Sequence, residues 1–484
     1  MRKSGILLAV SSLPSKYGIG DFGQEAYRFI DDLKTAKIKI WQILPLNPLG
    51  YGNSPYQPYS SKAMDDLYIS LDFLYEAKLI SKPTLFRQFQ SEVDYDAVRK
   101  YKSVYLKEAF NNFVKDENYQ LFAKQKWVYN YAVFMCFKRL NNFKPWNLWP
   151  LEQISWINNQ KYDLTSHQEA IEFEIFKQYI LYCQWLQLKE YANSLDIEIM
   201  GDIPFYVGFD SVDVYENSQA FLLDETYHPT FIAGVPPDYF AKHGQRWGNP
   251  IYNWDYLQQT NFKFWINRIS YNAKLFDIIR IDHFRAFDTY WKIPASCETA
   301  EIGKWVKAPG YLFFDELLAR CPNLNIVAED LGDITNGVEA LRDYYHFKGM
   351  KIMQFDFDSE KTGHKYQTGI NTIAYTGTHD NDTVMGWFQA QSQKKQKIIR
   401  RKLKQRHYDY QNIALQFISY VLESDAAYAI IPMQDILGLN TKARMNFPGT
   451  IGDPNWTWKM TDFRKFEQKV HILKRLVKKY QRFK

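Results

Sequence analysis

The sequence predicts an α/β protein built on a (β/α)8 barrel. Eight short apolar runs recur along its 484 residues, and segments long enough for helices separate them. The runs are continuously apolar rather than alternating, which is typical of parallel strands covered on both faces. They are residues 5–10, 38–44, 197–203, 278–284, 325–329, 349–355, 373–378 and 426–432. Parallel strands in this number favour a closed barrel with its active site at the carboxyl ends of the strands.

The spacing of these strands divides the chain into three parts. Residues 1–79 carry the first two strands and the loop Gly50–Tyr59, whose glycines, prolines and tyrosines predict irregular structure and a binding platform. Residues 80–194 carry helical patterns, and we interpret them as an inserted, mainly helical subdomain. Residues 195–484 carry the other six strands, with an active-site loop insertion at about 204–270.

The charge balance does not indicate a polyanionic partner. Sixty basic and 54 acidic residues leave a formal charge of +6, which is small for a chain of this length. One basic run, Lys394–Arg406, contains no acid, and the segment after Arg464 is also basic. Nucleic-acid binding is the function that such runs allow, but no recognised nucleic-acid motif accompanies them. We interpret them as solvated helix faces and expect no nucleic-acid partner.

Compartment and membrane signals favour the cytoplasm. The apolar run Ile6–Val10 is too short for the core of a signal peptide. No segment approaches the roughly 20 apolar residues of a membrane span, so we expect no membrane partner. The four cysteines lie far apart without a Cys-x-x-Cys pair, which favours reduced structural thiols over zinc or redox chemistry.

A glycine-rich loop matches the residue spacing of a dinucleotide-binding fingerprint but not its structural context. Gly18, Gly20 and Gly23 have the G-x-G-x-x-G spacing. A nicotinamide site needs these glycines directly after a strand and an acid about 20 residues later, at the end of the next strand. Pro14 separates the loop from its strand, and the strand at 38–44 ends without an acid. We therefore expect no nicotinamide cofactor.

Carboxylates stand at the ends of four predicted strands. They are Asp202, Asp282, Glu329 and Asp380. The carboxyl ends of barrel strands converge on one face, so these side chains should meet although they are far apart in sequence. Within its strand, Arg280 shares a face with Asp282, because strand side chains alternate with a period of two. The pattern predicts an active site that contains several acids and a guanidinium.

Two kinds of chemistry suit this set of residues. The chain lacks a Gly-x-Ser-x-Gly elbow, a Ser-His-Asp order and a phosphate loop, which leaves glycosyl chemistry or a metal site. His283 and His379 are possible metal ligands and leave a metal site as an alternative, but no ligand spacing such as His-Glu-x-x-His supports it. Each histidine adjoins an acid in a strand-like stretch, so we expect the two to point to opposite faces. We favour the histidines as hydrogen-bond donors to substrate or carboxylate.

Glycosyl transfer with retention requires one ionised and one protonated carboxyl group about 5 to 5.5 Å apart. Arg280 should lower the pKa of Asp282 and keep it ionised as the nucleophile. The apolar run before Glu329 should raise its pKa toward the role of acid and base. Asp380 is then free to hold sugar hydroxyls and to stabilise the oxocarbenium-like transition state.

Motifs along nearly the whole chain carry a family resemblance. They are Tyr17–Gly23, Trp41–Pro45, Gly52–Gln57, Gly201–Pro204, Pro236–Phe240, Gln245–Pro250, Arg280–Arg285, Ala328–Gly332, Thr376–Asn381 and Ala443–Asn446. With them the chain resembles the 4-α-glucanotransferases of the amylomaltase, or disproportionating-enzyme, family, which are relatives of the α-amylase barrel enzymes. One departure is Lys459, which stands where the family commonly has arginine.

The resemblance implies roles for individual residues. Asp282 matches the family's nucleophile, Glu329 its acid/base and Asp380 its transition-state stabiliser. Arg280 and His379 match residues beside the cleaved glucose. Further substrate contacts are expected from the tyrosine loop, from a loop that folds over the glucan, from the segment after it and from the third strand; the residues are Tyr56, Asp238, Tyr239, Gln245, Trp247, Asn249 and Asp202.

The implied reaction is transfer of α-1,4-glucan segments from a malto-oligosaccharide to the 4-hydroxyl of glucose or another glucan, including starch or glycogen. The resemblance implies no cofactor and no calcium. An α-glucan hydrolase with the same residues is the alternative, since it differs only in whether water or a sugar reaches the intermediate. A catalytically silent glucan-binding barrel is a third hypothesis.

Overall fold

The protein is described by a computed structural model that covers residues 2–87, 90–237, 242–358, 368–406, 408 and 410–483. Eight parallel strands form one sheet in the order β10-β11-β12-β1-β2-β3-β6-β9. They are β1 Lys3–Leu7, β2 Ile40–Gln42, β3 Glu198–Ile203, β6 Ile278–Ile281, β9 Ile326–Ala328, β10 Gly349–Ile352, β11 Thr372–Tyr375 and β12 Tyr428–Pro432. These are the eight predicted runs, so the predicted strand count is confirmed.

The two outer strands of this sheet meet and close the barrel. Val327 of β9 forms a parallel bridge with Lys348, directly before β10. The backbone N–H of Ala328 donates to the Lys348 carbonyl at 2.8 Å. On the opposite side, β1 lies between β12 and β2, with Gly5 paired to Ile430 and Ile40. The predicted (β/α)8 fold class is confirmed.

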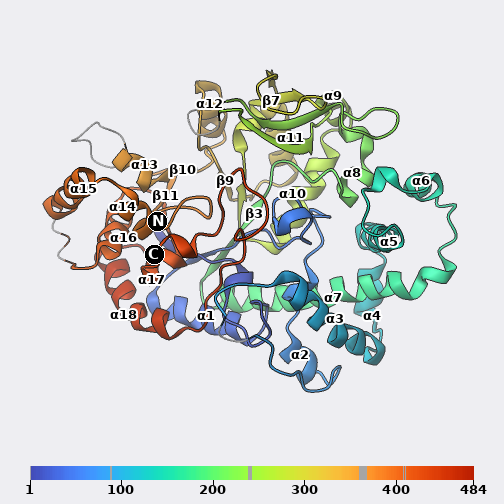
Figure 1. Ribbon diagram of the computed structural model, residues 1–484, viewed down its shortest axis with the longest axis horizontal. Helices are drawn as coiled ribbons and strands as arrows, with labels where there is room; N and C mark the ends of the chain where they lie inside the picture. The colour runs from blue at the N-terminus through green and yellow to red at the C-terminus, as the bar shows by residue number, and fades with distance from the viewer. Residues whose placement is uncertain are drawn as a thin grey trace.

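Helices surround the strands (Figure 1). The first, α1 (Gln24–Ala36), buries Ala26, Phe29, Ile30 and Leu33, whose spacing of three and four residues forms one apolar stripe. Lys37 ends it in the left-handed conformation with φ 61°. The other barrel helices are α10 Lys263–Leu275, α11 Gly310–Arg320, α12 Asn336–Tyr344, α13 Met353–Asp358, α14 Val384–Ala390, α15 Gln393–Gln405, α16 Ile413–Glu423, α17 Met433–Leu437 and α18 Arg464–Lys479.

The described part of residues 80–194, which follows α2 (Leu71–Glu76), contains helices and no strands. They are α3 Tyr95–Asn112, α4 Glu117–Ala123, α5 Lys126–Leu140, α6 Leu151–Asn159 and α7 Gln168–Ser194. Asp94 and Asp116 cap α3 and α4 by accepting backbone N–H bonds. The long α7 reaches the barrel, where the Trp185 ring lies 5.9 Å from Phe276.

A second, antiparallel sheet accompanies the barrel in the order β5-β4-β7-β8. Its strands are β4 Phe231–Val235, β5 Gln245–Pro250, β7 Thr289–Pro294 and β8 Lys304–Lys307. This sheet was not predicted. The predicted loop insertion at about 204–270 supplies two of its strands and the short helices α8 (Val212–Glu216) and α9 (Trp254–Gln259), whereas the other two strands follow β6.

Several barrel strands end earlier than predicted. The run 278–284 leaves the sheet after Ile281, because His283 is left-handed with φ 50° and a short 3-10 helix follows. The run 349–355 ends at Ile352, where α13 begins. The run 5–10 ends at Leu7. Apolar residues continue past these strand ends because the following turns are also buried against the core.

Lys459 is a buried cation in the segment before α18. Its side chain is 1% exposed, and within the described residues its Nζ has no hydrogen-bond partner. Burial disfavours the charged ammonium group and lowers the pKa of Lys459 to about 8.

Replacing Lys459 by methionine should raise the free energy of unfolding at pH 7 by about 3 kcal/mol, because it removes a charge whose folded-state pKa is about 8 against about 10.4 unfolded. Since the folded protein binds fewer protons between those pH values, wild-type stability should rise with pH from about 8 to about 10.4. The variant's advantage shrinks over that window. Urea unfolding at pH 7 and pH 10 measures both effects, and equal midpoints for the two proteins at pH 7 would contradict the expectation.

Candidate functional site

A cleft of about 620 Å³ opens at the carboxyl ends of the barrel strands. Its walls come from the loop after β2, from β5 and from the turns after β6, β11 and α17. Predicted site residues that line it are Tyr56, Gln245, Trp247, Asn249, Asp282, His379 and Asp380. The structure therefore brings together residues that span more than three hundred positions of the sequence.

Arg280 forms the buried ionic centre beneath the cleft. The parallel register of β3 and β6 sets it opposite Asp202, on the same face. Its Nη1 lies 2.7 Å from both carboxylate oxygens of Asp202, and its Nη2 lies 3.0 Å from Oδ1 of Asp282. Both Arg280 and Asp202 are almost fully buried. The prediction that Arg280 and Asp282 share a face is confirmed, and Arg280 holds the Asp282 carboxylate in one orientation.

The predicted direction of the Asp282 pKa is wrong. Loss of hydration in the cleft raises the pKa of Asp282, Arg280 lowers it, and Glu329 raises it again. The net shift is upward, because burial and neighbouring carboxylates outweigh a guanidinium that is shared with Asp202. Geometry rather than a depressed pKa thus distinguishes Asp282 from the other acids.

Glu329 lies directly after β9, and two backbone groups fix its carboxyl group. The N–H of His283 donates to Oε2 at 2.7 Å and the N–H of Leu331 donates to Oε1 at 3.0 Å. Burial raises the pKa of Glu329, while Arg280 and these two bonds lower it. The predicted upward shift is confirmed. Because His283 follows Asp282 in the chain, its left-handed backbone couples the positions of the two carboxyl groups.

Asp380 lies in the turn after β11, where residues from beyond α17 hold it. Asn446 Nδ2 donates to Asp380 Oδ1 at 2.7 Å, and Arg444 Nη2 donates to the Asp380 carbonyl at 2.6 Å. Asn446 was not among the predicted site residues. Its motif, Ala443–Asn446, was visible in the sequence, but a contact between residues 66 positions apart was not.

The expectation that His379 and Asp380 point to opposite faces is wrong. His379 Nε2 lies 3.4 Å from Asp380 Oδ2, because β11 ends at Tyr375 and the pair stands in a turn rather than a strand. Burial lowers the pKa of His379 and keeps the ring neutral near pH 7. Neutral His379 can therefore hydrogen-bond to the Asp380 carboxylate, as the sequence favoured.

His283 has different surroundings. The edge of the Trp247 ring packs against it at a centroid distance of 4.9 Å. Burial, assisted by Arg285, lowers the pKa of His283 to about 3. Its buried Nε2 has no hydrogen-bond partner in the described part of the chain.

Among the described residues, no group of three or more His, Cys, Asp and Glu side chains is placed to hold a metal ion.

Aromatic rings form one wall of the cleft. Tyr56 stacks on His379 at 5.2 Å with an interplanar angle of 15°, and its hydroxyl donates to Asp202 at 2.7 Å. Trp456 lies 5.7 Å from Tyr56 and 5.8 Å from His379. Flat rings of this kind pack against the apolar faces of sugars. The tyrosine platform was predicted through Tyr56, whereas Trp456 was not predicted.

The β5 strand also lines the cleft. Trp247 Nε1 donates to Gln245 Oε1 at 3.1 Å, and Gln57 Nε2 donates to the Trp247 carbonyl at 3.0 Å. Asn249 is buried, and its amide donates to the Val207 carbonyl at 2.9 Å, so it holds the loop after β3. Two other predicted contacts, Asp238 and Tyr239, lie outside the described residues.

Together these groups suit chemistry on a polyhydroxylated, uncharged ligand. Asp282 and Asp380 face one cleft, and Glu329 is fixed beside Asp282 through the backbone of His283.

No helix within the described residues is long and apolar enough to cross a membrane.

Comparison with known proteins gives a consistent result. A family model described as 4-alpha-glucanotransferase matches residues 8–465. The 4-alpha-glucanotransferase of Synechocystis sp. is 44% identical over 485 residues, which cover 95% of this chain and 94% of the relative. That of Aquifex aeolicus is 40% identical over 489 residues, covering 100% of both. The structure of amylomaltase from Streptococcus agalactiae in complex with acarbose has a TM-score of 0.93, at 36% identity and full coverage of both chains.

Proposed function

The chain belongs to the 4-alpha-glucanotransferase family, and from that premise we propose that its cleft transfers α-1,4-glucan segments by retaining double displacement through a covalent glycosyl-enzyme. The observation that carries this assignment is a backbone hydrogen bond that holds Glu329 beside Asp282. The residue after Asp282 donates its backbone N–H to the Glu329 carboxyl group at 2.7 Å. A retaining mechanism requires a carboxyl pair only about 5 to 5.5 Å apart, and this backbone hydrogen bond supports a close pair because it holds Glu329 to the residue next to Asp282.

In the first step, an Asp282 oxygen bonds to the anomeric carbon as the bond from that carbon to the glycosidic oxygen breaks. Glu329 gives its proton to the departing oxygen, and its raised pKa favours the protonated form needed for this role. Arg280 keeps Asp282 oriented along the line of attack. The donor's remaining sugar leaves with a free 4-hydroxyl group.

In the second step, Glu329 accepts the proton of an acceptor's 4-hydroxyl group while that oxygen attacks the anomeric carbon. The bond to Asp282 breaks, and the configuration is restored. Asp380 faces the developing positive charge of both transition states. Asn446 fixes the Asp380 carboxylate by its hydrogen bond of 2.7 Å, which supports a stabilising role for Asp380.

The substrates that we propose are malto-oligosaccharides and glucose, with starch or glycogen as longer donors. The adjacent rings of Tyr56, His379 and Trp456 support sugar binding at one wall. The amylomaltase from Streptococcus agalactiae is described in complex with acarbose. We propose a cytoplasmic location, in keeping with four cysteines that are all unpaired, and we treat 80–194 as a subdomain inserted between residues 1–79 and 195–484 of the barrel.

Incubation with maltotriose tests the reaction. We expect glucose and oligomers longer than maltotriose, with the number of reducing ends nearly constant, because each broken glycosidic bond is replaced by a new one. Product chromatography and a reducing-end assay on the same samples measure both quantities. A steady rise in reducing ends without longer products would identify a hydrolase, in which water rather than sugar resolves the intermediate.

A further inference from the structure

The segment between β11 and α14, residues 376–383, carries His379 and Asp380 but has no regular secondary structure. Within it, Asn381 Oδ1 accepts from the Thr378 backbone N–H at 2.9 Å and from the Thr378 hydroxyl at 3.0 Å. These local bonds shape the turn. They do not attach it to the barrel.

One carboxylate holds both ends of this segment. Asp435 lies on α17, directly after β12, which is the neighbour of β11 in the barrel. Its Oδ2 accepts from the Thr376 hydroxyl at 2.6 Å, and its Oδ1 accepts from the backbone N–H of Val384 at 2.8 Å. Thr376 directly follows β11, and Val384 is the first residue of α14. The segment that carries Asp380 is therefore closed at its base by Asp435.

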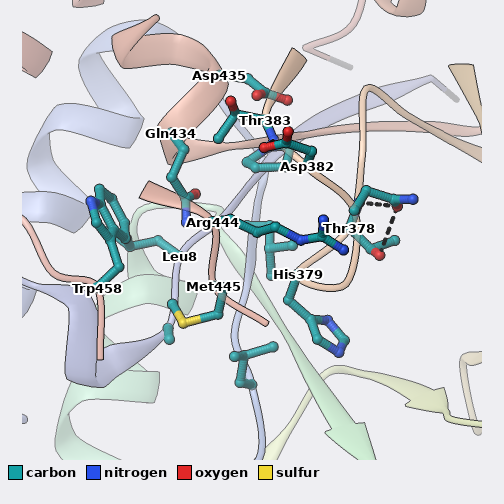
Figure 2. Close-up of a pocket in the computed structure, with 15 residues that line it drawn as sticks. Leu8, Thr378, His379, Asp382, Thr383, Gln434, Asp435, Arg444, Met445 and Trp458 are labelled. Atoms are coloured by element: carbon teal, nitrogen blue, oxygen red, sulfur yellow. Dashed lines mark hydrogen bonds between the residues drawn. The ribbon is translucent and has the colours of Figure 1, made fainter. Parts of the chain in front are cut away.

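Asp435 adjoins a cavity behind the catalytic turn (Figure 2). The side chains of Asp435, Thr383 and Asp382 gather on one side of this cavity, and Arg444 extends between them and His379 (Figure 2). Thr441 donates its hydroxyl to Asp382 at 2.8 Å, so the segment has a further attachment close to its second end. The same stretch of chain after β12 thus contacts the segment at both of its ends, at Asp382 and at Asp380.

Burial of the Asp435 carboxyl group at this position costs folding free energy. The side chain is 1% exposed, and in the described part of the chain no Lys, Arg or His forms an ion pair with it. Burial raises its pKa to about 7, the bonds from Thr376 and Val384 lower it, and Asp382 raises it. An asparagine of the same shape would avoid the cost of a buried charge, but it would offer an acceptor atom at only one of the two positions.

We propose that Asp435 is a positioning residue for glycosyl transfer, which acts by holding Thr376 and Val384 so that Asp380 keeps its place beside the reacting sugar. The proposal rests on the proposed function. Asp435 is not among the residues that line the cleft, and its effect reaches the reaction through Asp380. Since Asp380 is assigned to the transition state, its displacement lowers kcat more than it changes KM.

The first test is Asp435→Asn, with kinetics on maltotriose at pH 7 and thermal unfolding of the same samples. The expected result is a kcat about 100-fold lower, with KM changed less than about threefold, because a misplacement of about 1 Å can cost that much. Asp213→Asn is the matched control, because Asp213 is also a buried aspartate that accepts one backbone N–H and one hydroxyl, both from Ser61. It should lower thermal stability without the loss of kcat. An unchanged kcat in folded Asp435→Asn overturns the proposal.

The second test asks whether Asp435 acts through Asp380. In an Asp380→Asn background, adding Asp435→Asn should lower kcat by less than about threefold further, because the residue that it positions is already disabled. The same 100-fold loss in both backgrounds overturns the proposal. Failure of the wild-type protein to make longer oligomers from maltotriose would instead reject the proposed function.

A third pair of variants keeps the proposal testable if Asp435→Asn does not fold. Thr376→Ser retains the hydroxyl that donates to Asp435, whereas Thr376→Val removes it at nearly the same volume. The serine variant should keep kcat within about twofold of wild type, and the valine variant should lose about tenfold, the factor that corresponds to one hydrogen bond of about 1.4 kcal/mol. Equal kcat values for the two variants overturn the proposal.

Discussion

Asp282→Asn should lower kcat by about 10⁴- to 10⁶-fold, the range seen when the nucleophile of a covalent mechanism is removed. The amide cannot form the glycosyl ester, and the other acids of the site are held by their own partners: Asp202 by Arg280 and Asp380 by Asn446. Disproportionation of maltotriose measures the loss. Asp196→Asn is the control, since Asp196 is 78% exposed just before β3, at the opposite end of the strand from the cleft.

Trapping the intermediate gives the same assignment a direct readout. A fluorinated glucosyl fluoride, which forms the covalent ester quickly and breaks it slowly, should add one glycosyl unit to the wild-type protein. Mass spectrometry of the digested protein should place that unit on the peptide that contains Asp282, and Asp282→Asn should show no labelling. Label on the peptide of Glu329 or Asp380 would require a different nucleophile.

Glu329→Gln should lower kcat on maltotriose by about 10²- to 10⁴-fold, the usual contribution of a general acid and base. Glutamine keeps the acceptor for one backbone N–H but has no proton for the departing sugar oxygen. The loss should be smaller with a maltosyl fluoride donor, because fluoride leaves without protonation. Glu339→Gln, on the exposed face of α12, is the control.

The pH dependence of activity tests the same roles of Asp282 and Glu329. Burial raises the pKa of both Asp282 and Glu329, so both limbs of the activity profile should lie above the ordinary range of carboxyl groups. Activity should fall at low pH as the nucleophile becomes protonated and at high pH as the general acid loses its proton. The two limbs belong to the interacting pair rather than to single residues. In Glu329→Gln the alkaline limb of kcat/KM should disappear. A wild-type alkaline limb that survives in this variant would assign the acid to another group.

The barrel could be predicted because its strands carry a local signal. The predicted runs are rich in apolar residues, as burial on both faces requires, and all eight appear as parallel strands. The second sheet could not be predicted in this way. Its strands β5 and β8, Gln245–Pro250 and Lys304–Lys307, are polar, and they are defined by pairing with distant partners rather than by their own composition.

The site shows the same division between local and distant information. Asp282 and Arg280 are two residues apart on one strand, so their shared face followed from strand geometry. The contacts of Asp380 with Asn446 and of Thr376 with Asp435 join residues 66 and 59 positions apart, and no local pattern encodes them. The Asp282 pKa was misjudged because burial is the largest cause of its upward shift, with Glu329, Asp202 and Asp380 adding to it, whereas the sequence shows only the neighbouring Arg280.

The place of β1 between β2 and β12 also bears on how the protein is made. β1 ends at Leu7 and β12 begins at Tyr428, so roughly 420 residues separate the two partners of that ladder. At ribosomal rates of about 5 to 20 residues per second, β12 emerges roughly 20 to 80 s after β1. Through that time β1 has an unpaired edge, and the carboxylates of the cleft cannot yet surround a sugar. Activity must therefore appear only after β12 has been synthesised, however early the separate helices form.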